Sequence, residues 1–308
     1  MRDIENRALG ALLGLFTGDA FGAQTEFLTE RRVRQEHPDG FKEMDSRPRY
    51  IGEAGMITDD SEMAIMLAQS IIAKKTVDIE DVRSGYLRWL DASPSDVGTT
   101  ILGALRDGVM NSDSQANGAL MRIAPIGIAG ALADAKTTIA YSDLDCSITH
   151  VHPICRDVNR LWALAIAKTI REGLTAQQVY EYIAEIAPRI TDEQVLLDTI
   201  DIAKREGPVA CDGDNQGWVI IALHLSLYTL LHTASFEEGV IQITMRAGDT
   251  DTNAAIYGSL AGAVAGGAAI PSRWIEALRP TQCLERLLGA DALDLKSLAL
   301  SLVKGLLD

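Results

Sequence analysis

Apolar residues recur along this chain at the spacing of helices, and strand-like alternation is almost absent. The segment SEMAIMLAQSII places Met63, Met66 and Ile71 on one helical face. VNRLWALAIAKTI and WVIIALHLSLYTLL are apolar runs too long for ordinary strands, and IEDVRSGYLRWL and DLKSLALSLVKGLL are amphipathic. These helical runs predict an all-α protein. No Pro- or Gly-rich linker divides the chain into separate domains. We expect a single compact multi-helix domain over residues 1–308, with its longest loop at about 28–57.

Two rows of small residues recur at every fourth position, and on a helix each row forms one stripe. The rows are Gly10, Gly14, Gly18 and Gly22, and Ala254, Gly258, Gly262 and Gly266. A glycine inside a helix costs about 1 kcal/mol relative to alanine, so the rows need a compensating gain. Close approach of helix backbones is the simplest one. We expect both helices to be central, packed either on one another or tightly against other helices.

Composition narrows the classes of protein that the chain can belong to. It has 308 residues, of which 47% are hydrophobic, and this is enough to bury a large core. The net charge is −15 and no basic run stands out, so direct nucleic-acid binding is not expected. A charge of this sign favours basic partners, although an acidic surface usually serves only solubility.

The cysteines and the apolar segments bear on the compartment. The four cysteines form no C-x-x-C pair, which argues against a zinc or redox site, and scattered free thiols favour a reducing cytoplasm. Acidic residues precede the first apolar run and Asp19 lies inside it, which argues against a signal peptide. Residues 254–270 are mostly Ala and Gly, too weakly apolar for a convincing membrane span. We therefore expect a soluble cytoplasmic protein that does not bind membranes.

Two apolar helices are each preceded by a cluster of carboxylates and hydroxyls. The clusters are Thr58, Asp59, Asp60 and Ser61 in GMITDDSEMAIM, and Asp249, Thr250, Asp251 and Thr252 in GDTDTNAAIYGSLAGA. Asp249 and Asp251 would point about 200° apart on a regular helix, so they converge only in a loop or a first helical turn. Capping explains one such oxygen per helix, whereas each cluster offers four polar side chains.

If the two helix starts pack together, four carboxylates gather inside the protein. Unpaired buried charge is very costly, so the arrangement implies bound cations. The candidate ligands are all oxygen atoms, which favours hard ions, Mg²⁺ first, with Mn²⁺ or Ca²⁺ as alternatives. Four carboxylates suggest two ions, which lie about 3.5–4 Å apart in dinuclear sites.

Four sequence blocks together resemble a known family. The blocks are GALLGLFTGDAFGAQTEF, MITDDSEM, NGALMRIAPIG and GDTDTNAAIYGSLAGA, with weaker echoes in SDVGTT and ITHVHP. They run from residue 10 to residue 267 and resemble the ADP-ribosylglycohydrolases, the family of the dinitrogenase-reductase-activating glycohydrolase and the ADP-ribosyl-acceptor hydrolases. One departure is Ser61, where the family commonly has Thr, but a hydroxyl is kept. The resemblance implies an all-α fold, in agreement with the periodicity.

The resemblance also implies an activity and its metal ligands. The implied activity is metal-dependent hydrolysis of the ribosyl bond in mono-ADP-ribosylated protein side chains, which releases ADP-ribose. The implied cofactors are two Mg²⁺ ions, or Mn²⁺, with oxygen ligands from Thr58, Asp59, Asp60, Asp249, Asp251 and Thr252. Ions of this kind orient ribose hydroxyls and lower the pKa of a bound water, so Asp60 and Asp249 are also assigned to catalysis. Glu26 is implied to lie over the metals as a proton-transfer or gating group.

Further residues are implied to bind the substrate. Asn117, Gly118 and Ala119, in NGALMR, would line the diphosphate, and His150 would either form a hydrogen bond with it or be a buried structural histidine. Asn117 and Gly118 either begin a helix, whose backbone N–H groups would suit phosphate, or form a turn that a helix follows. Arg122 is either a phosphate contact or a structural ion-pair partner. Trp218 and Tyr257 can stack on a base, but we interpret both as core residues.

Two other functions use the same residues. A dinuclear oxygen-ligand site also serves phosphohydrolases. A relative that has lost catalysis can bind ADP-ribose or block a toxin, although retention of every mapped ligand favours the enzyme. The expected partner is an ADP-ribosylated protein or another ADP-ribose conjugate, with arginine as the first candidate acceptor. The sequence decides neither between arginine, serine, nucleic-acid and small conjugates nor the oligomeric state.

Overall fold

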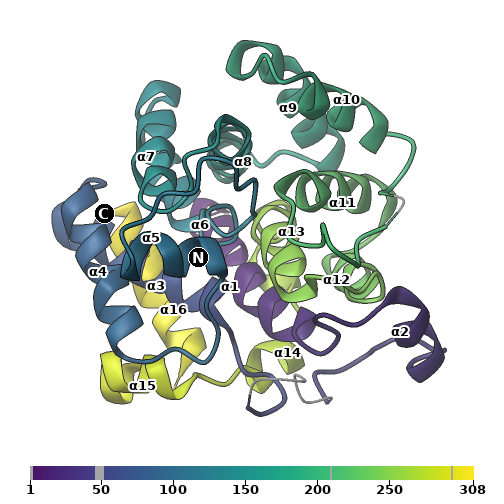
Figure 1. Cartoon of the computed structure of the whole chain (residues 1–308), viewed down its shortest axis with the longest axis horizontal. Coiled ribbons are helices and arrows are strands. Elements are labelled where there is room, and N and C mark those ends of the chain that lie inside the picture. Colours follow the sequence, from purple (N-terminus) through teal and green to yellow (C-terminus); the bar gives the residue numbers. More distant parts are fainter. Residues whose placement is uncertain (1–2, 46–51, 209, 293) are drawn as a thin grey trace.

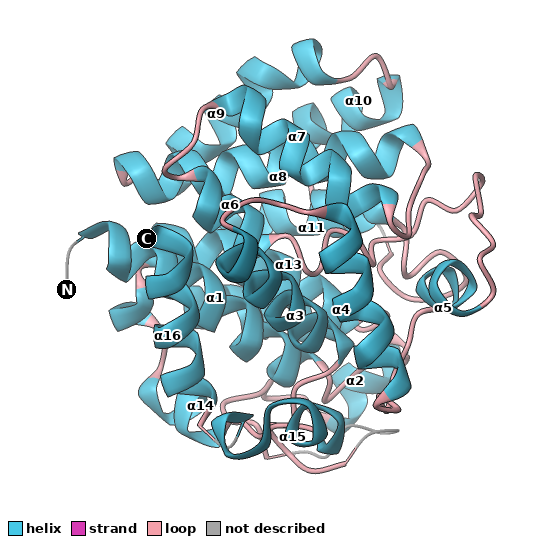
Figure 2. Ribbon diagram, turned by 90° about the vertical axis from the view of Figure 1, so that its left-hand side faces the viewer, coloured by secondary structure: helices cyan, strands magenta, loops and turns pink. Residues whose placement is uncertain are grey.

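The amphipathic and apolar segments fold as helices, which confirms the all-α prediction. The structure, a computed structural model, describes residues 3–45, 52–208, 210–292 and 294–308, and within these ranges it contains no strand (Figures 1 and 2). The α-helices are α1 (Asp3–Gly22), α2 (Glu30–Glu36), α3 (Asp59–Lys74), α4 (Ile79–Asp91), α5 (Thr99–Arg106), α6 (Ala124–Gly130), α7 (Ala135–Ser147), α8 (Pro153–Glu172), α9 (Ala176–Ile190), α10 (Gln194–Ala203), α11 (Val219–His232), α12 (Phe236–Thr244), α13 (Thr250–Ala265), α14 (Ser272–Ala277), α15 (Gln282–Leu288) and α16 (Leu295–Leu307).

The two rows of small residues are the contact between α1 and α13, which run antiparallel through the middle of the molecule (Figure 1). A Cβ built on Gly10 would lie within 3.0 Å of the carbonyl oxygen of Gly262, and one built on Gly14 equally close to that of Gly258. The same holds where Gly22 meets Thr250. The predicted close approach is thus confirmed, and of the two arrangements left open the helices adopt packing on one another.

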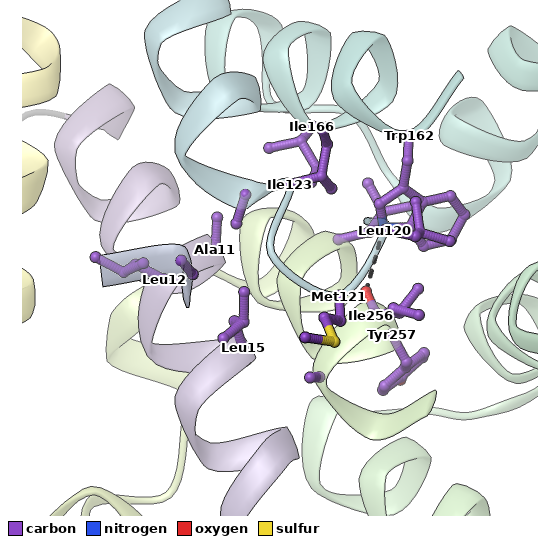
Figure 3. Close-up of a cluster of buried hydrophobic side chains, with 14 of the residues drawn as sticks. Ala11, Leu12, Leu15, Leu120, Met121, Ile123, Trp162, Ile166, Ile256 and Tyr257 are labelled. Atoms are coloured by element: carbon purple, nitrogen blue, oxygen red, sulfur yellow. Dashed lines mark hydrogen bonds between the residues drawn. The ribbon is translucent and has the colours of Figure 1, made fainter. Parts of the chain in front are cut away.

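Large apolar side chains fill the space around this pair. Ala11, Leu12 and Leu15 of α1 face a cluster that Trp162 and Ile166 of α8 complete from another side (Figure 3). The indole nitrogen of Trp162 donates to the backbone oxygen of Ile256 at 3.2 Å, so this buried polar group is satisfied. These residues belong to one continuous buried cluster that also includes residues from α3, α11 and α16, as expected for one hydrophobic core.

The long loop predicted at 28–57 is partly wrong, because α2 lies within it. Thr29 caps α2 by accepting a hydrogen bond from Arg32 N, a local signal that the prediction did not use. Residues 37–40, HPDG, form a turn region as predicted, whereas RPRY at 47–50 lies outside the described residues.

The four cysteines are free and buried. Across the described parts of the chain, no helix combines the length and the apolar character needed to cross a bilayer.

Candidate active site

The start of α3 is capped by a residue of α1. Asp19 accepts hydrogen bonds from Thr58 N at 3.0 Å and from Ser61 N at 3.2 Å, and the Ser61 hydroxyl also donates to it. Thr58, although it stands at the N-cap position, makes no side-chain capping bond. Capping by Asp19 leaves the carboxylates of Asp59 and Asp60 without that role, so capping does not explain the first acidic cluster.

The start of α13 is held against the end of α1. The Thr250 hydroxyl donates to Gly22 O at 2.7 Å, and Phe27 N donates to Gly248 O at 2.8 Å. Asp249, at the N-cap position of α13, makes no side-chain capping bond. The close packing of α1 on α13 therefore brings Glu26, just beyond α1, next to Asp251 in the first turn of α13.

The carboxylates of both clusters are buried and repel one another. Burial, together with neighbouring carboxylates that include Asp59 and Asp249, raises the pKa of Asp60 well above its ordinary value. Burial, then the charges of Glu26, Asp60 and Asp249, does the same for the pKa of Asp251. The predicted gathering of the two helix starts is therefore present in the fold.

Glu26 joins this cluster. Burial raises its pKa to about 8, and the charges of Asp96, Asp249 and Asp19 add to the effect. One carboxylate oxygen of Glu26 lies within 4.8 Å of one of Asp251, so the two groups do not both carry full charge at low cost. Without cations the cluster therefore retains protons at neutral pH.

The donor set suits a divalent cation. One carboxylate oxygen from each of Glu26, Asp96 and Asp251 lies within 4.8 Å of the other two. Asp60 Oδ1 is buried and has no hydrogen-bond partner, which is costly unless a cation meets it. No lysine or arginine is found among the described residues that line the cavity beside this cluster. All the available donors are oxygens, so the residues fit a hard ion such as Mg²⁺.

A cavity of about 320 Å³ opens beside the cluster. Its acidic wall carries Glu26, Asp59, Asp96, Asp249, Asp251 and Thr252. Asp60 and Thr58 lie behind this wall, where the Thr58 hydroxyl donates to Asp60 Oδ2 at 3.1 Å. The structure thus brings together the six residues assigned to metal binding, but only four of them line the cavity.

The rest of the cavity wall contains most of the residues assigned to substrate. Asn117, Gly118 and His150 line the cavity, whereas Ala119 is fully buried and does not. Residues 118–122 form consecutive turns and α6 begins only at Ala124, so of the two alternatives the chain adopts the turn followed by a helix, and the helix start near Asn117 is wrong.

The structure also shows the surroundings of Arg122, Tyr257 and Trp218, the three side chains for which the sequence allowed more than one role. Arg122 is fully buried and pairs with Asp145 at 3.0 Å, so it is the structural ion-pair partner and not a phosphate contact. Tyr257 is a core residue, as interpreted. Trp218 is half-buried; it lines a neighbouring cavity of about 590 Å³ and donates from its indole nitrogen to Gln115 at 2.8 Å.

The sequence interpretation missed Asp19 and Asp96 as members of this site. Asp19 interrupts the apolar glycine-row helix, and a carboxylate in such a helix needs a partner, which was an available signal. Asp96 stands in SDVGTT just before α5, so it repeats the pattern of acidic residues ahead of a helix. The sequence interpretation assigned no role to SDVGTT. Asp96 is identified as a member of the site because the fold brings it close to Glu26.

The chain is similar to known proteins over most of its length. A family model described as ADP-ribosylglycohydrolase matches residues 1–301. The chain is 29% identical over 286 residues to the ADP-ribosyl-(dinitrogen reductase) glycohydrolase of Rhodospirillum rubrum, which covers 89% of this chain and 91% of that protein. It is 26% identical over 289 residues to the ADP-ribosylarginine hydrolase Tri1 of Serratia proteamaculans, covering 89% and 75%. A solved structure titled ADP-ribosylglycohydrolase-related protein complex superposes with a TM-score of 0.79 at 26% identity, over 99% of both chains.

Proposed function

The chain belongs to the ADP-ribosylglycohydrolase family and is a hydrolase of ADP-ribosyl linkages; on that premise, we propose that it releases ADP-ribose from mono-ADP-ribosylated arginine in proteins, with two Mg²⁺ ions as cofactors. The observation that carries the proposal is the buried acidic wall, which faces a cavity whose other wall presents Asn117, Gly118 and His150.

The proposed metal ligands are the residues of the two helix starts. They are Thr58, Asp59, Asp60, Asp249, Asp251 and Thr252, and the short distances among Glu26, Asp96 and Asp251 support adding Glu26 and Asp96. Bound divalent cations would supply Lewis acidity to the ribose hydroxyls and to water. The chain's own contribution is to hold these oxygens rigidly: Asp19 fixes the start of α3, and α1 fixes the start of α13.

Hydrolysis breaks the bond between the anomeric carbon and the acceptor atom and forms a bond from that carbon to a water oxygen. The water loses a proton and the leaving guanidine nitrogen takes one, through an oxocarbenium-like transition state. Glu26 is the proposed group for this transfer, since its carboxyl lines the cavity beside the acidic wall and is the kind of group that moves protons in such reactions. The Asn117 side chain donates to Asp249 at 2.7 Å and so links the acidic wall to the part of the cavity lining that carries Gly118 and His150.

Arginine is the proposed acceptor for two reasons. Both relatives compared above are ADP-ribosyl hydrolases, and the one from Serratia proteamaculans is named for ADP-ribosylarginine. The net charge of −15 also favours a basic surface around a modified arginine, although salt screens such attraction beyond about 8–10 Å.

The test compares an ADP-ribosyl-arginine protein with an ADP-ribosyl-serine peptide in Mg²⁺, with free ADP-ribose as the readout. Release from the arginine conjugate is expected. Rapid release from the serine peptide with none from arginine would overturn the acceptor assignment.

A further inference from the structure

A buried chain of polar side chains leads from α7 to the cavity and ends at His150. Asp145, Arg122, Thr149 and His150 are all fully buried. The Arg122 Nε donates to Asp145 Oδ2 at 3.0 Å, and its Nη2 donates to the Thr149 hydroxyl oxygen at 3.0 Å. That hydroxyl lies 2.8 Å from Nδ1 of His150. The other ring nitrogen, Nε2, is buried without a hydrogen-bond partner, and His150 lines the cavity.

The donors and acceptors of this chain allow one satisfied arrangement of protons. A guanidinium only donates, so Thr149 Oγ1 accepts from Arg122. If Nδ1 also donated to that oxygen, the buried hydroxyl hydrogen would have no acceptor among the contacts that Thr149 makes, which costs stability. When the hydroxyl donates to Nδ1 instead, every group from Arg122 to Nδ1 is satisfied, and the neutral ring carries on Nε2 a proton that has no acceptor within the protein. Burial, with the Arg122 charge as a second cause, lowers the pKa of His150 to about 3, so the ring is neutral.

A glycine stands beside the ring of His150. A Cβ built on Gly118 would lie 3.2 Å from Cε1 and 3.4 Å from Nε2 of His150, so a side chain at position 118 would crowd this nitrogen. Arg122 also donates from Nη1 to Gly118 O at 3.1 Å. One buried guanidinium therefore positions both the glycine backbone and, through Thr149, the histidine ring.

We propose that the chain Asp145–Arg122–Thr149 fixes His150 as a neutral hydrogen-bond donor, with its proton on Nε2, aimed at an acceptor oxygen of bound ADP-ribose. Thr149, Arg122 and Asp145 are thus positioning residues for ligand binding, although none of the three lines the cavity. The contact of His150 with ADP-ribose is the one that the family resemblance implies and rests on the proposed function, whereas the positioning chain and the proton that it fixes are the new inference. The proton assignment does not rest on that function, because it follows from contacts within the protein.

The proton assignment is measured on the free wild-type protein by NMR with ¹⁵N-labelled histidine, in which protonated and unprotonated ring nitrogens resonate far apart. His150→Gln identifies the His150 signals by their disappearance. At neutral pH we expect Nε2 to be protonated and Nδ1 to be unprotonated. A proton on Nδ1 would overturn the inference, whatever the variants below do.

The ligand half is measured as the Kd for ADP-ribose by calorimetry, with thermal melting to confirm folding. His150→Leu should weaken binding roughly 10- to 100-fold, because it deletes a donor to a charged group. His150→Gln retains an N–H near the position of Nε2 and should lose much less. Thr149→Val should weaken binding several-fold and alter the ring nitrogen signals, whereas Thr149→Ser, which keeps the hydroxyl, should restore both.

Wild-type affinity in folded Thr149→Val and His150→Leu would remove His150 from ligand binding. ADP-ribose binding with the expected tautomer, but without hydrolysis of any conjugate, would refute the proposed function and leave this inference standing. Hydrolysis of a conjugate together with a proton on Nδ1 would refute this inference and leave the proposed function standing. Absence of any ADP-ribose binding by the wild-type protein would overturn the ligand half of the inference and the proposed function together.

Discussion

Asn117 donates a hydrogen bond of 2.7 Å from Nδ2 to Oδ2 of Asp249, across 132 positions of the sequence. Asn117 belongs to the cavity wall assigned to the diphosphate, and Asp249 belongs to the acidic wall. Burial raises the pKa of Asp249, and the bond from Asn117 opposes part of that rise and so favours the charged form that a cation needs. The two walls of the cavity are thus joined at one point, and metal binding and ligand binding are expected to depend on each other.

The contact between α1 and α13 predicts the effect of adding a single methyl group. In Gly14→Ala the new Cβ would meet the backbone of Gly258, which has no rotamer to change, so we expect a loss of roughly 3 kcal/mol or more in unfolding free energy. Gly85 on α4 is the matched control, because its nearest neighbouring atom would be 3.9 Å from an added Cβ. Gly85→Ala should be neutral or stabilising by up to about 1 kcal/mol. Denaturant unfolding measures both, and equal stability of the two variants would contradict the role of the glycine row.

The buried carboxylates predict how stability depends on pH without metal. Burial is the main cause that raises the pKa of Asp19 to about 6, of Glu62 to about 7 and of Glu26 to about 8, from ordinary values of 3.8, 4.5 and 4.5. Between about pH 5 and pH 8 the folded chain therefore binds more protons than the unfolded chain, so its stability falls as pH rises through that window. In EDTA, Tm should drop by several degrees from pH 5.5 to pH 8.

Mg²⁺ should reverse this trend. Cations compete with protons for the same oxygens, so the increase in Tm on adding Mg²⁺ should be larger at pH 8 than at pH 6. The experiment is a series of melting curves over pH with EDTA or with Mg²⁺. A Tm that rises with pH in EDTA, or an Mg²⁺ effect that shrinks as pH rises, would count against a buried, cation-binding cluster.

Glu26→Gln tests the proton-transfer role. The amide keeps the size of the side chain but does not exchange protons, so turnover should fall by about 10²–10⁴-fold. Affinity for ADP-ribose should change much less, because the lost function concerns the reacting bond. Glu185→Gln, on an exposed part of α9, is the matched control and should behave as wild type. Turnover of Glu26→Gln within a factor of about two of the wild type would exclude Glu26 from catalysis.

Local patterns were sufficient to predict the long helices α3, α4, α8, α11 and α16, the two glycine-row helices and the two acidic helix starts, because each depends on spacing within one segment. Residues whose roles depend on long-range contacts were not predicted. Asp19 caps α3 from 39 positions away, and Asp96 acquires its neighbours only when α5 packs beside the cluster. Arg122 was left open between phosphate and ion pair because its partner, Asp145, lies on another helix. Short helices such as α2 were missed because seven residues carry little periodicity.

The most direct test of the account is ADP-ribose release from an ADP-ribosyl-arginine protein by wild type, Asp251→Asn and Asp201→Asn, with Mg²⁺ and after chelation. Asp251 is buried in the cluster, whereas Asp201 lies exposed on α10 and pairs with Arg205 four positions along the helix, so the same substitution there serves as the control.

We predict that wild type and Asp201→Asn release ADP-ribose only with the metal present. Asp251→Asn, although folded, should lose at least about 100-fold in activity and bind Mg²⁺ more weakly by calorimetry. Release that persists after chelation, or unchanged Mg²⁺ binding and turnover in Asp251→Asn, would contradict the claim that this buried acidic cluster holds the catalytic cations.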